Sequence, residues 1–222
     1  MNASEFDLIT FDCYGTLIDW EGGITEAFQR EAALDGLSFE RESIIAAYHT
    51  EEPAVEAEYR TYREVLTETA QRVASRLGWH IEPDRARFLA ASLPEWKPFA
   101  DTNAALERLA RGFSLGILSN TDDDLLALTR RHFTSDFDLI VTAQQVRSYK
   151  PGHAHFIEAR RRAGDERILH AAQSYFHDVV PARALGLPVV WVNRKSERVP
   201  QGGVEPTAEV PNLAALADLL GE

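Results

Sequence analysis

The chain has 222 residues, and 45% of them are hydrophobic, which is enough for one large domain or for one domain with a smaller insertion. Its formal net charge of −12 argues against a nucleic acid or an anionic membrane surface as partner, although a local pocket can still bind a small anion. The single cysteine, Cys13, excludes an internal disulfide, and the N-terminus lacks the regions of a signal peptide. We therefore expect a cytoplasmic protein with no nucleic-acid partner and no membrane partner.

Short apolar runs alternate with helical patterns over most of the chain, which is typical of α/β proteins with a mostly parallel sheet. Thr121 and Asp122 can cap a helix that ends near His132, and Pro151 suits the first position of a helix that ends near Gly164. The predicted strands cover residues 6–11, 113–118, 138–141, 168–172 and 189–192, so we expect five strands or more.

The stretch from residue 21 to residue 96 breaks this alternation. Apolar side chains recur there at helical spacing, as in the series Tyr59, Tyr62 and Leu66, and no convincing strand interrupts them. Such a stretch is too long for an ordinary connection between strands. We predict a core domain of residues 1–18 and 98–222, with an all-helical domain of residues 19–97 inserted after the first strand.

Polar residues collect just beyond the predicted strands. Ligands of parallel sheets bind outside the carboxyl ends of the strands, near the point where the strand order reverses. Each residue alone has an ordinary explanation as a turn, a helix cap or a solvated charge. Together they form an anion pocket that contains a nucleophile: Asp12 after the first strand, Ser119 and Asn120 after the second, Lys150 after the third and Asp178 after the fourth.

The order of these residues resembles the haloacid dehalogenase superfamily. Its first motif is a strand that ends in Asp-x-x-Gly-Thr-Leu, and residues 12–17 read DCYGTL. The later motifs supply a Ser or Thr, a Lys and an acidic residue, which match Ser119, Lys150 and Asp178. The resemblance implies a Rossmann-like core, a helical cap after the first strand and a nucleophilic role for Asp12.

Two positions separate phosphate chemistry from halide chemistry within this superfamily. Most members are magnesium-dependent phosphatases, which carry a second Asp two residues after the nucleophile as a general acid; here that residue is Tyr14. A general acid contributes about 10²–10⁴-fold to a rate, but a halide leaves without a proton. Gln173 stands where the phosphatases place a carboxylate for Mg²⁺, and a neutral amide is a weak ligand for that ion. We therefore expect no cofactor.

The type II 2-haloacid dehalogenase branch shows Asp-x-Tyr-Gly-Thr-Leu followed later by Ser-Asn, as this chain does. The resemblance implies that Asp12 attacks the halogen-bearing carbon, giving an ester with inverted stereochemistry that water then hydrolyses. Lys150 would keep Asp12 ionised, because a nearby positive charge lowers the pKa of a carboxyl group. Asp178 would orient Lys150 or the hydrolytic water.

The resemblance also implies the substrate-binding residues. Members of the branch use an arginine of the cap to receive the halide, but residues 43–58 contain no arginine. Arg41, Arg60 and Arg63 flank that segment and their spacing does not choose among them; we name Arg41 and Arg60 as candidates. The remaining substrate-binding candidates are Tyr14, Thr16, Ser119 and Asn120.

The leading hypothesis is a metal-independent hydrolase of short 2-haloacids, whose partner is a small anionic organic substrate. One alternative is a phosphatase-like hydrolase that uses Asp12 with a degraded magnesium site. Another is a catalytically weak member that serves as a binding protein. Dimers are common among members of the family, so the resemblance also suggests a homodimer.

Overall fold

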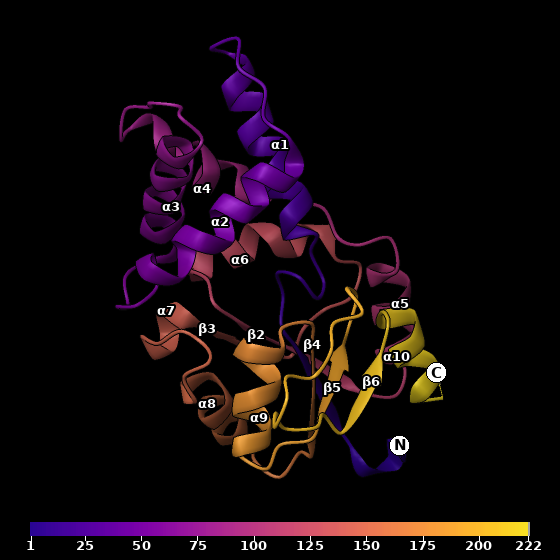
Figure 1. The fold of residues 1–222 in the computed structure, drawn as a ribbon. Helices are drawn as coiled ribbons and strands as arrows, with labels where there is room; N and C mark the ends of the chain where they lie inside the picture. Colours follow the sequence, from indigo (N-terminus) through magenta and orange to yellow (C-terminus); the bar gives the residue numbers. More distant parts are fainter. Residues whose placement is uncertain (222) are drawn as a thin grey trace. The chain divides into compact units, whose positions relative to one another are not determined.

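The computed structural model describes residues 1–221, so residue 222, the last of the predicted core domain, lies outside the described residues. The chain divides into two compact units (Figure 1). An α/β unit contains residues 1–18 and 98–120 and the chain from Arg131 onward. A helical unit contains residues 19–97 together with residues 121–130.

A six-stranded sheet forms the centre of the α/β unit (Figure 1). All neighbouring strands are parallel, and their order is β3-β2-β1-β4-β5-β6, so the prediction of a mostly parallel α/β fold is confirmed. The chain order reverses between β1 and β4. The strands are β1 (Leu8–Phe11), β2 (Ser114–Ser119), β3 (Leu139–Thr142), β4 (Ile168–Ala172), β5 (Val189–Val192) and β6 (Ala208–Val210).

Strands β1, β4 and β5 are buried along their whole length, as expected for strands covered on both faces, and this burial explains their continuous apolar sequence. The core between sheet and helices includes Leu118, Val141, Phe156 and Trp191. Helices α5 and α10 lie side by side, and α8 packs against β2 and β3. The helices of this unit are α5 (Thr102–Leu109), α7 (Ala143–Val146), α8 (Ala154–Ala163), α9 (Val180–Ala184) and α10 (Leu213–Leu219).

Three more short helices differ from the regular α-helix. They are the 3₁₀ helices η1 (Ala3–Glu5) and η4 (Arg130–His132) and the π-helix η5 (Tyr175–Val179). The prediction that Pro151 begins a helix is wrong, because α8 begins at Ala154 and Pro151 lies in the preceding turn.

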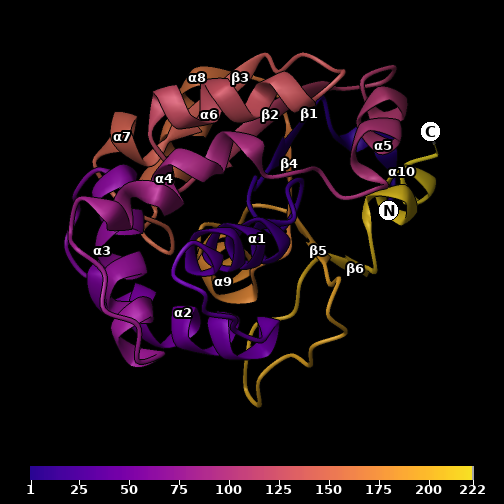
Figure 2. The ribbon, with the colours of Figure 1, turned by 90° about the horizontal axis from the view of Figure 1, so that it is seen from above.

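The helical unit is built around α1 (Trp20–Ala33), α2 (Arg41–Val55) and α3 (Tyr62–Arg76) (Figure 2), and α2 packs against α3. Gly23 lets α1 approach Trp96 closely, because a Cβ atom at this position would lie only 2.2 Å from the indole ring. The rings of Phe28 and Phe88 pack edge to face at 5.0 Å in the same interior. The smaller elements are η2 (Arg85–Arg87), α4 (Phe88–Ser92), η3 (Leu93–Glu95) and α6 (Asp123–Thr129).

Residues 121–130, which we expected in the core domain, group with the helical unit. The carboxylate of Asp122 accepts hydrogen bonds from the backbone N–H groups of Tyr62 and Arg63 at 2.9 and 3.0 Å. It thereby caps α3 and makes no capping bond to its own helix, α6. These backbone contacts, 59 and 60 residues apart in the chain, attach the segment to the helical unit.

Candidate active site

Asp12 follows β1, the strand at which the order of the sheet reverses. The next turn needs Gly15, whose φ of 104° is unfavourable for residues with a side chain. Thr16 then lies four residues after Asp12, and its hydroxyl donates to Asp12 Oδ2 at 2.9 Å. The same hydroxyl accepts a hydrogen bond from the backbone N–H of Gln173, also at 2.9 Å. Thr16, which we predicted to bind substrate, therefore orients Asp12 and ties the turn to the end of β4.

Lys150 is the cation of the site and is only 2% exposed. Its ammonium donates to Asp12 Oδ1 at 2.9 Å, to the carbonyl oxygen of Leu118 at 2.9 Å and to Asp178 Oδ1 at 2.6 Å. The structure thus brings the three predicted catalytic side chains into direct contact. All three ammonium hydrogens have an acceptor, which is what a buried lysine requires.

Asp178 is completely buried in η5, the π-helix that follows β4. Its Oδ1 atom accepts from Lys150 and also from His170 Nε2, the latter at 2.9 Å. Its Oδ2 atom is buried and has no hydrogen-bond partner among residues 1–221. A buried carboxylate oxygen without a partner is costly, so this atom marks a place for a water molecule or a ligand.

The charges of the site follow from these contacts. Burial raises the pKa of Asp178, but the charge of Lys150 and the hydrogen bond from His170 outweigh it and hold this pKa below its ordinary range. Burial also raises the pKa of Asp12, and the single ion pair with Lys150 does not offset the effect. The lysine therefore lowers the pKa of Asp12 as expected, but the net direction is upward. Burial lowers the pKa of Lys150, yet the two carboxylates raise it overall, so the ammonium stays charged.

Ser119 and Asn120 end β2 beside this centre but differ in their contacts. Ser119 Oγ is buried and has no hydrogen-bond partner within the described part of the chain. The amide of Asn120 makes two hydrogen bonds to the backbone of Lys150: Nδ2 donates to its carbonyl oxygen at 3.0 Å and Oδ1 accepts from its N–H at 2.7 Å. Ser119 thus has an unused hydroxyl to offer a ligand, whereas Asn120 holds the backbone of Lys150.

Two buried histidines belong to the site although we did not predict them. His155 Nε2 lies 3.2 Å from the carbonyl oxygen of Ser119, and burial, followed by the charge of Lys150, lowers the pKa of His155 to about 3. His170 contacts Asp178 from within β4, and Thr10 contacts the other ring nitrogen of His170. For His170 the available signal was a polar residue inside an otherwise apolar strand, ILHAA, opposite Thr10 of LITF. His155 lies on helix α8 and had no such signal.

Three further side chains lie just after β1 and β4. Tyr14 is half-buried in the turn after Asp12. The hydroxyl of Tyr175 donates to the carbonyl oxygen of Val204 at 2.8 Å, so this side chain is fixed to a neighbouring loop. His177 Nδ1 lies 3.2 Å from Ser174 Oγ, and burial lowers the pKa of His177.

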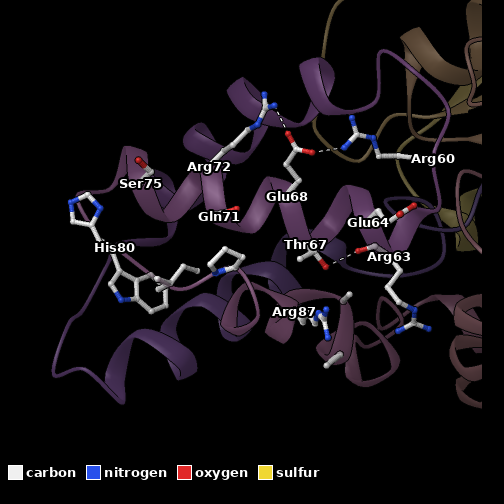
Figure 3. Close-up of a pocket in the computed structure, with 15 residues that line it drawn as sticks. Arg60, Arg63, Glu64, Thr67, Glu68, Gln71, Arg72, Ser75, His80 and Arg87 are labelled. Carbon is white, nitrogen blue, oxygen red and sulfur yellow. Dashed lines mark hydrogen bonds and ion pairs between the residues drawn. The ribbon is translucent and has the colours of Figure 1, made fainter.

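The two predicted arginines belong to the helical unit, where each already pairs with a carboxylate. Arg41 contacts Glu21 at 3.2 Å. Arg60 and Arg72 both pair with Glu68 on the rim of a cavity of about 1040 Å³ along α3 (Figure 3). This cavity lies within the helical unit, and none of the three predicted catalytic residues lines it. The role of Arg41 and Arg60 as halide ligands stays a prediction.

The residues of the site do not suit Mg²⁺. This ion prefers several anionic or water oxygens in an octahedral arrangement. Asp12 and Asp178 each have one oxygen bonded to the ammonium of Lys150, and the nearby Gln173 is neutral. No group of three or more His, Cys, Asp or Glu side chains within residues 1–221 could hold a metal ion.

Comparisons with known proteins agree with this arrangement. A model of the haloacid dehalogenase-like hydrolases matches residues 6–175. The (S)-2-haloacid dehalogenase H-109 of Pseudomonas putida is 26% identical over 223 residues, which cover 96% of each chain. An (S)-2-haloacid dehalogenase of Pseudomonas fluorescens is 30% identical over 163 residues, or 71% of each chain. The solved L-2-haloacid dehalogenase of Xanthobacter autotrophicus with covalently bound chloropropionic acid shares the fold, with a TM-score of 0.85 at 20% identity and coverage of 97% of this chain and 98% of that one.

Fold and site together define a Rossmann-like α/β hydrolase with a carboxylate at the point where the strand order of its sheet reverses. The chain belongs to the haloacid dehalogenase-like hydrolases, and the resemblance seen in its motifs is confirmed. No helix within the described residues is long and apolar enough to cross a membrane.

Proposed function

We propose that this enzyme hydrolyses the carbon–halogen bond of short 2-haloacids through an ester formed on Asp12, without a metal ion. The observation that carries the proposal is the contact of Asp12 with Lys150 and Thr16, in a site where Tyr14 replaces the acid that a phosphatase needs. The two Pseudomonas relatives described above, which are named (S)-2-haloacid dehalogenases, support the same substrate class.

In the first half of the reaction, a carboxylate oxygen of Asp12 attacks the halogen-bearing carbon from the side opposite the halogen. The new C–O bond forms as the carbon–halogen bond breaks, and the halide leaves with the bonding electron pair. The configuration at this carbon inverts. Lys150 and Thr16 hold the two carboxylate oxygens of Asp12, which keeps the nucleophile oriented and balances its charge.

In the second half, water attacks the carbonyl carbon of the ester on Asp12. The C–O bond between the side-chain carbonyl carbon of Asp12 and the substrate oxygen breaks, and the alkoxide that leaves takes the proton of the newly formed Asp12 carboxyl group. This step releases the 2-hydroxy acid and restores the carboxylate. One proton of the water passes to Asp178, whose Oδ2 atom is an unused acceptor within the described residues. His177 lies next to Asp178 in the same helix and is a weaker candidate for this base.

The substrate carboxylate would bind to Ser119 Oγ, the unused hydroxyl at the end of β2. Asn120 and Thr16 then act indirectly, because their polar groups already hold Lys150 and Asp12. Tyr14 would form part of the halide side of the pocket. The helical unit would serve as the cap, with Arg41 or Arg60 as the halide ligand. A cytoplasmic location and a homodimer complete the proposal.

Halide release from L-2-chloropropionate, measured beside turnover of p-nitrophenyl phosphate, tests this function when both assays are run with and without EDTA. We expect halide release that EDTA does not reduce and little phosphate release. A phosphatase activity that EDTA abolishes, with no halide release from any short 2-haloacid, would contradict the proposal and favour the degraded magnesium site. The absence of both activities would favour a binding protein.

A further inference from the structure

His170 is a polar residue in the middle of β4, one of the two central strands of the sheet. It lies on β4 directly opposite Thr10 of β1, and both residues are completely buried. Its ring packs edge to face on Phe156 at 5.2 Å. Burying an apolar residue at this position would cost less desolvation free energy. We therefore expect neighbouring polar groups to form hydrogen bonds with the imidazole.

Both nitrogens of the His170 ring have a partner. Thr10 Oγ1 lies 2.9 Å from Nδ1, and Asp178 Oδ1 lies 2.9 Å from Nε2. Asp178 is ionised and can only accept, so Nε2 carries a hydrogen whether the ring is neutral or charged. When the ring is neutral, the hydroxyl of Thr10 donates to Nδ1 and selects this tautomer.

The two hydrogen bonds to Asp178 Oδ1 come from residues in different segments of the chain. Lys150 follows β3 and donates at 2.6 Å, whereas His170 donates from within β4. Two donors on one oxygen fix the rotation of the carboxylate and leave Oδ2 as its unused acceptor within residues 1–221. The orientation of Oδ2 therefore depends on His170 as well as on Lys150.

We propose that His170, set by Thr10, is a positioning residue that holds Asp178 so that Oδ2 receives the water that hydrolyses the ester on Asp12. The inference rests on the proposed function. Two other side chains of the turn are less suited to this task, since the hydroxyl of Tyr175 is bound to Val204 and Phe176 is 62% exposed. Formation of the ester does not need Asp178 to accept a proton, so His170 acts on the second half of the reaction.

Rapid-quench kinetics combined with intact-protein mass spectrometry separate the two halves. L-2-chloropropionate is mixed with the wild-type enzyme and with the variants His170→Phe, His170→Gln and Thr10→Val. In His170→Phe we expect an initial burst of one halide per enzyme at nearly the wild-type rate, then turnover slowed about 10-fold to 100-fold, because water activation is impaired. The mass of the enzyme should then show the accumulated ester.

The remaining variants distinguish positioning from structure. His170→Gln keeps an N–H donor for Asp178 and should recover much of the second step, and Thr10→Val should give an intermediate rate. His153→Phe, on an exposed residue of the loop before α8, is the control and should behave as the wild type. Wild-type turnover in His170→Phe, or an equal loss of both steps that His170→Gln does not recover, would overturn the inference.

A readout that needs no turnover keeps this inference separate from the proposed function. In ¹⁵N spectra of the histidine rings, His170 should carry hydrogen on Nε2 in the wild type, and this signal should shift in Asp178→Asn and in Thr10→Val. If no 2-haloacid is hydrolysed, the proposed function fails by itself. If the ring carries its hydrogen only on Nδ1, the positioning of Asp178 by His170 is wrong whatever the substrate.

Discussion

Lys150 connects the two acidic residues of the site, and the geometry of its ammonium decides how the site is charged. The lysine and Asp178 are almost inaccessible to solvent, and Asp12 is 8% exposed. Removing one member of such a buried cluster leaves charges without a counterion, which costs far more than the pair itself contributes. The lysine is therefore needed for folding as well as for the proposed chemistry.

The variant Lys150→Met should show both effects. The two carboxylates would face each other without a cation, so we expect the free energy of unfolding to fall by about 3–5 kcal/mol and halide release to disappear. Chemical denaturation measures the first effect. The matched control is Lys97→Met, which changes an exposed lysine and should leave both quantities nearly unchanged. A stable Lys150→Met protein with normal halide release would contradict the role of this lysine.

His155 makes stability depend on pH. The imidazole has a pKa near 6.5 in the unfolded chain, but in the folded protein burial and then the charge of Lys150 lower its pKa to about 3. Between these values the unfolded state binds more protons, so stability should fall by about 2 kcal/mol from pH 7 to pH 5 through this residue.

His155→Gln removes the titration but keeps an N–H donor for the carbonyl oxygen of Ser119. Urea denaturation at pH 7 and pH 5 should show a smaller loss of stability in this variant than in the wild type. His153→Gln, at an exposed position of the same region, should retain the wild-type dependence. An unchanged loss of stability in His155→Gln would mean that other groups cause it.

At the scale of elements, the N-terminus of α3 shows how a distant residue completes a helix. The first N–H groups of a helix have no partner within it. Thr61 Oγ1 accepts from Glu64 N–H in a capping box, and Asp122 accepts from the N–H groups of Tyr62 and Arg63. The N–H of Thr61 donates in turn to the Glu64 carboxylate, so all four N–H groups are satisfied, and the negative charge also suits this end of the helix.

Asp122→Ala should therefore destabilise the helical unit. It removes two hydrogen bonds to buried or partly buried N–H groups, and we expect a loss of about 1–3 kcal/mol in the free energy of unfolding. Circular dichroism during urea denaturation measures this loss, and Asp123→Ala at the neighbouring exposed position is the control. Equal stabilities of the two variants would show that the cap on α3 contributes little.

Several elements could be predicted because their burial leaves a simple pattern. The central strands are mostly apolar, and Asp12, Ser119 and Lys150 could be predicted because Asp12 and Ser119 lie at strand ends and Lys150 lies in the connection after β3. Strand β6 escaped prediction, since its three residues Ala208–Val210 include an exposed glutamate and lie at the sheet edge. His170 was missed because its partner Thr10 lies 160 residues away, and only the strand register brings the two together.

At the scale of the whole molecule, the α/β unit explains why an aspartate, a lysine and a second aspartate from distant segments form one centre. Parallel strands end at the same edge of the sheet, and the order reverses between β1 and β4, the strands that precede Asp12 and Asp178. The family match covers residues 6–175, which include Asp12 and Lys150 but end before Asp178. The assignment of Asp178 to the last acidic motif of the family therefore rests on the geometry, in which Asp178 Oδ1 lies 2.6 Å from Lys150 Nζ.

The central claim is that Asp12 forms a covalent ester and that water attacks this ester rather than the substrate. A single turnover of L-2-chloropropionate in ¹⁸O-labelled water, with enzyme in excess, tests it directly. We expect the label to enter the carboxylate of Asp12 and the lactate formed to be unlabelled, as mass spectrometry of the peptide and the product would show. Label in the lactate with none in Asp12 would mean that water attacks the substrate itself and that no ester forms on Asp12.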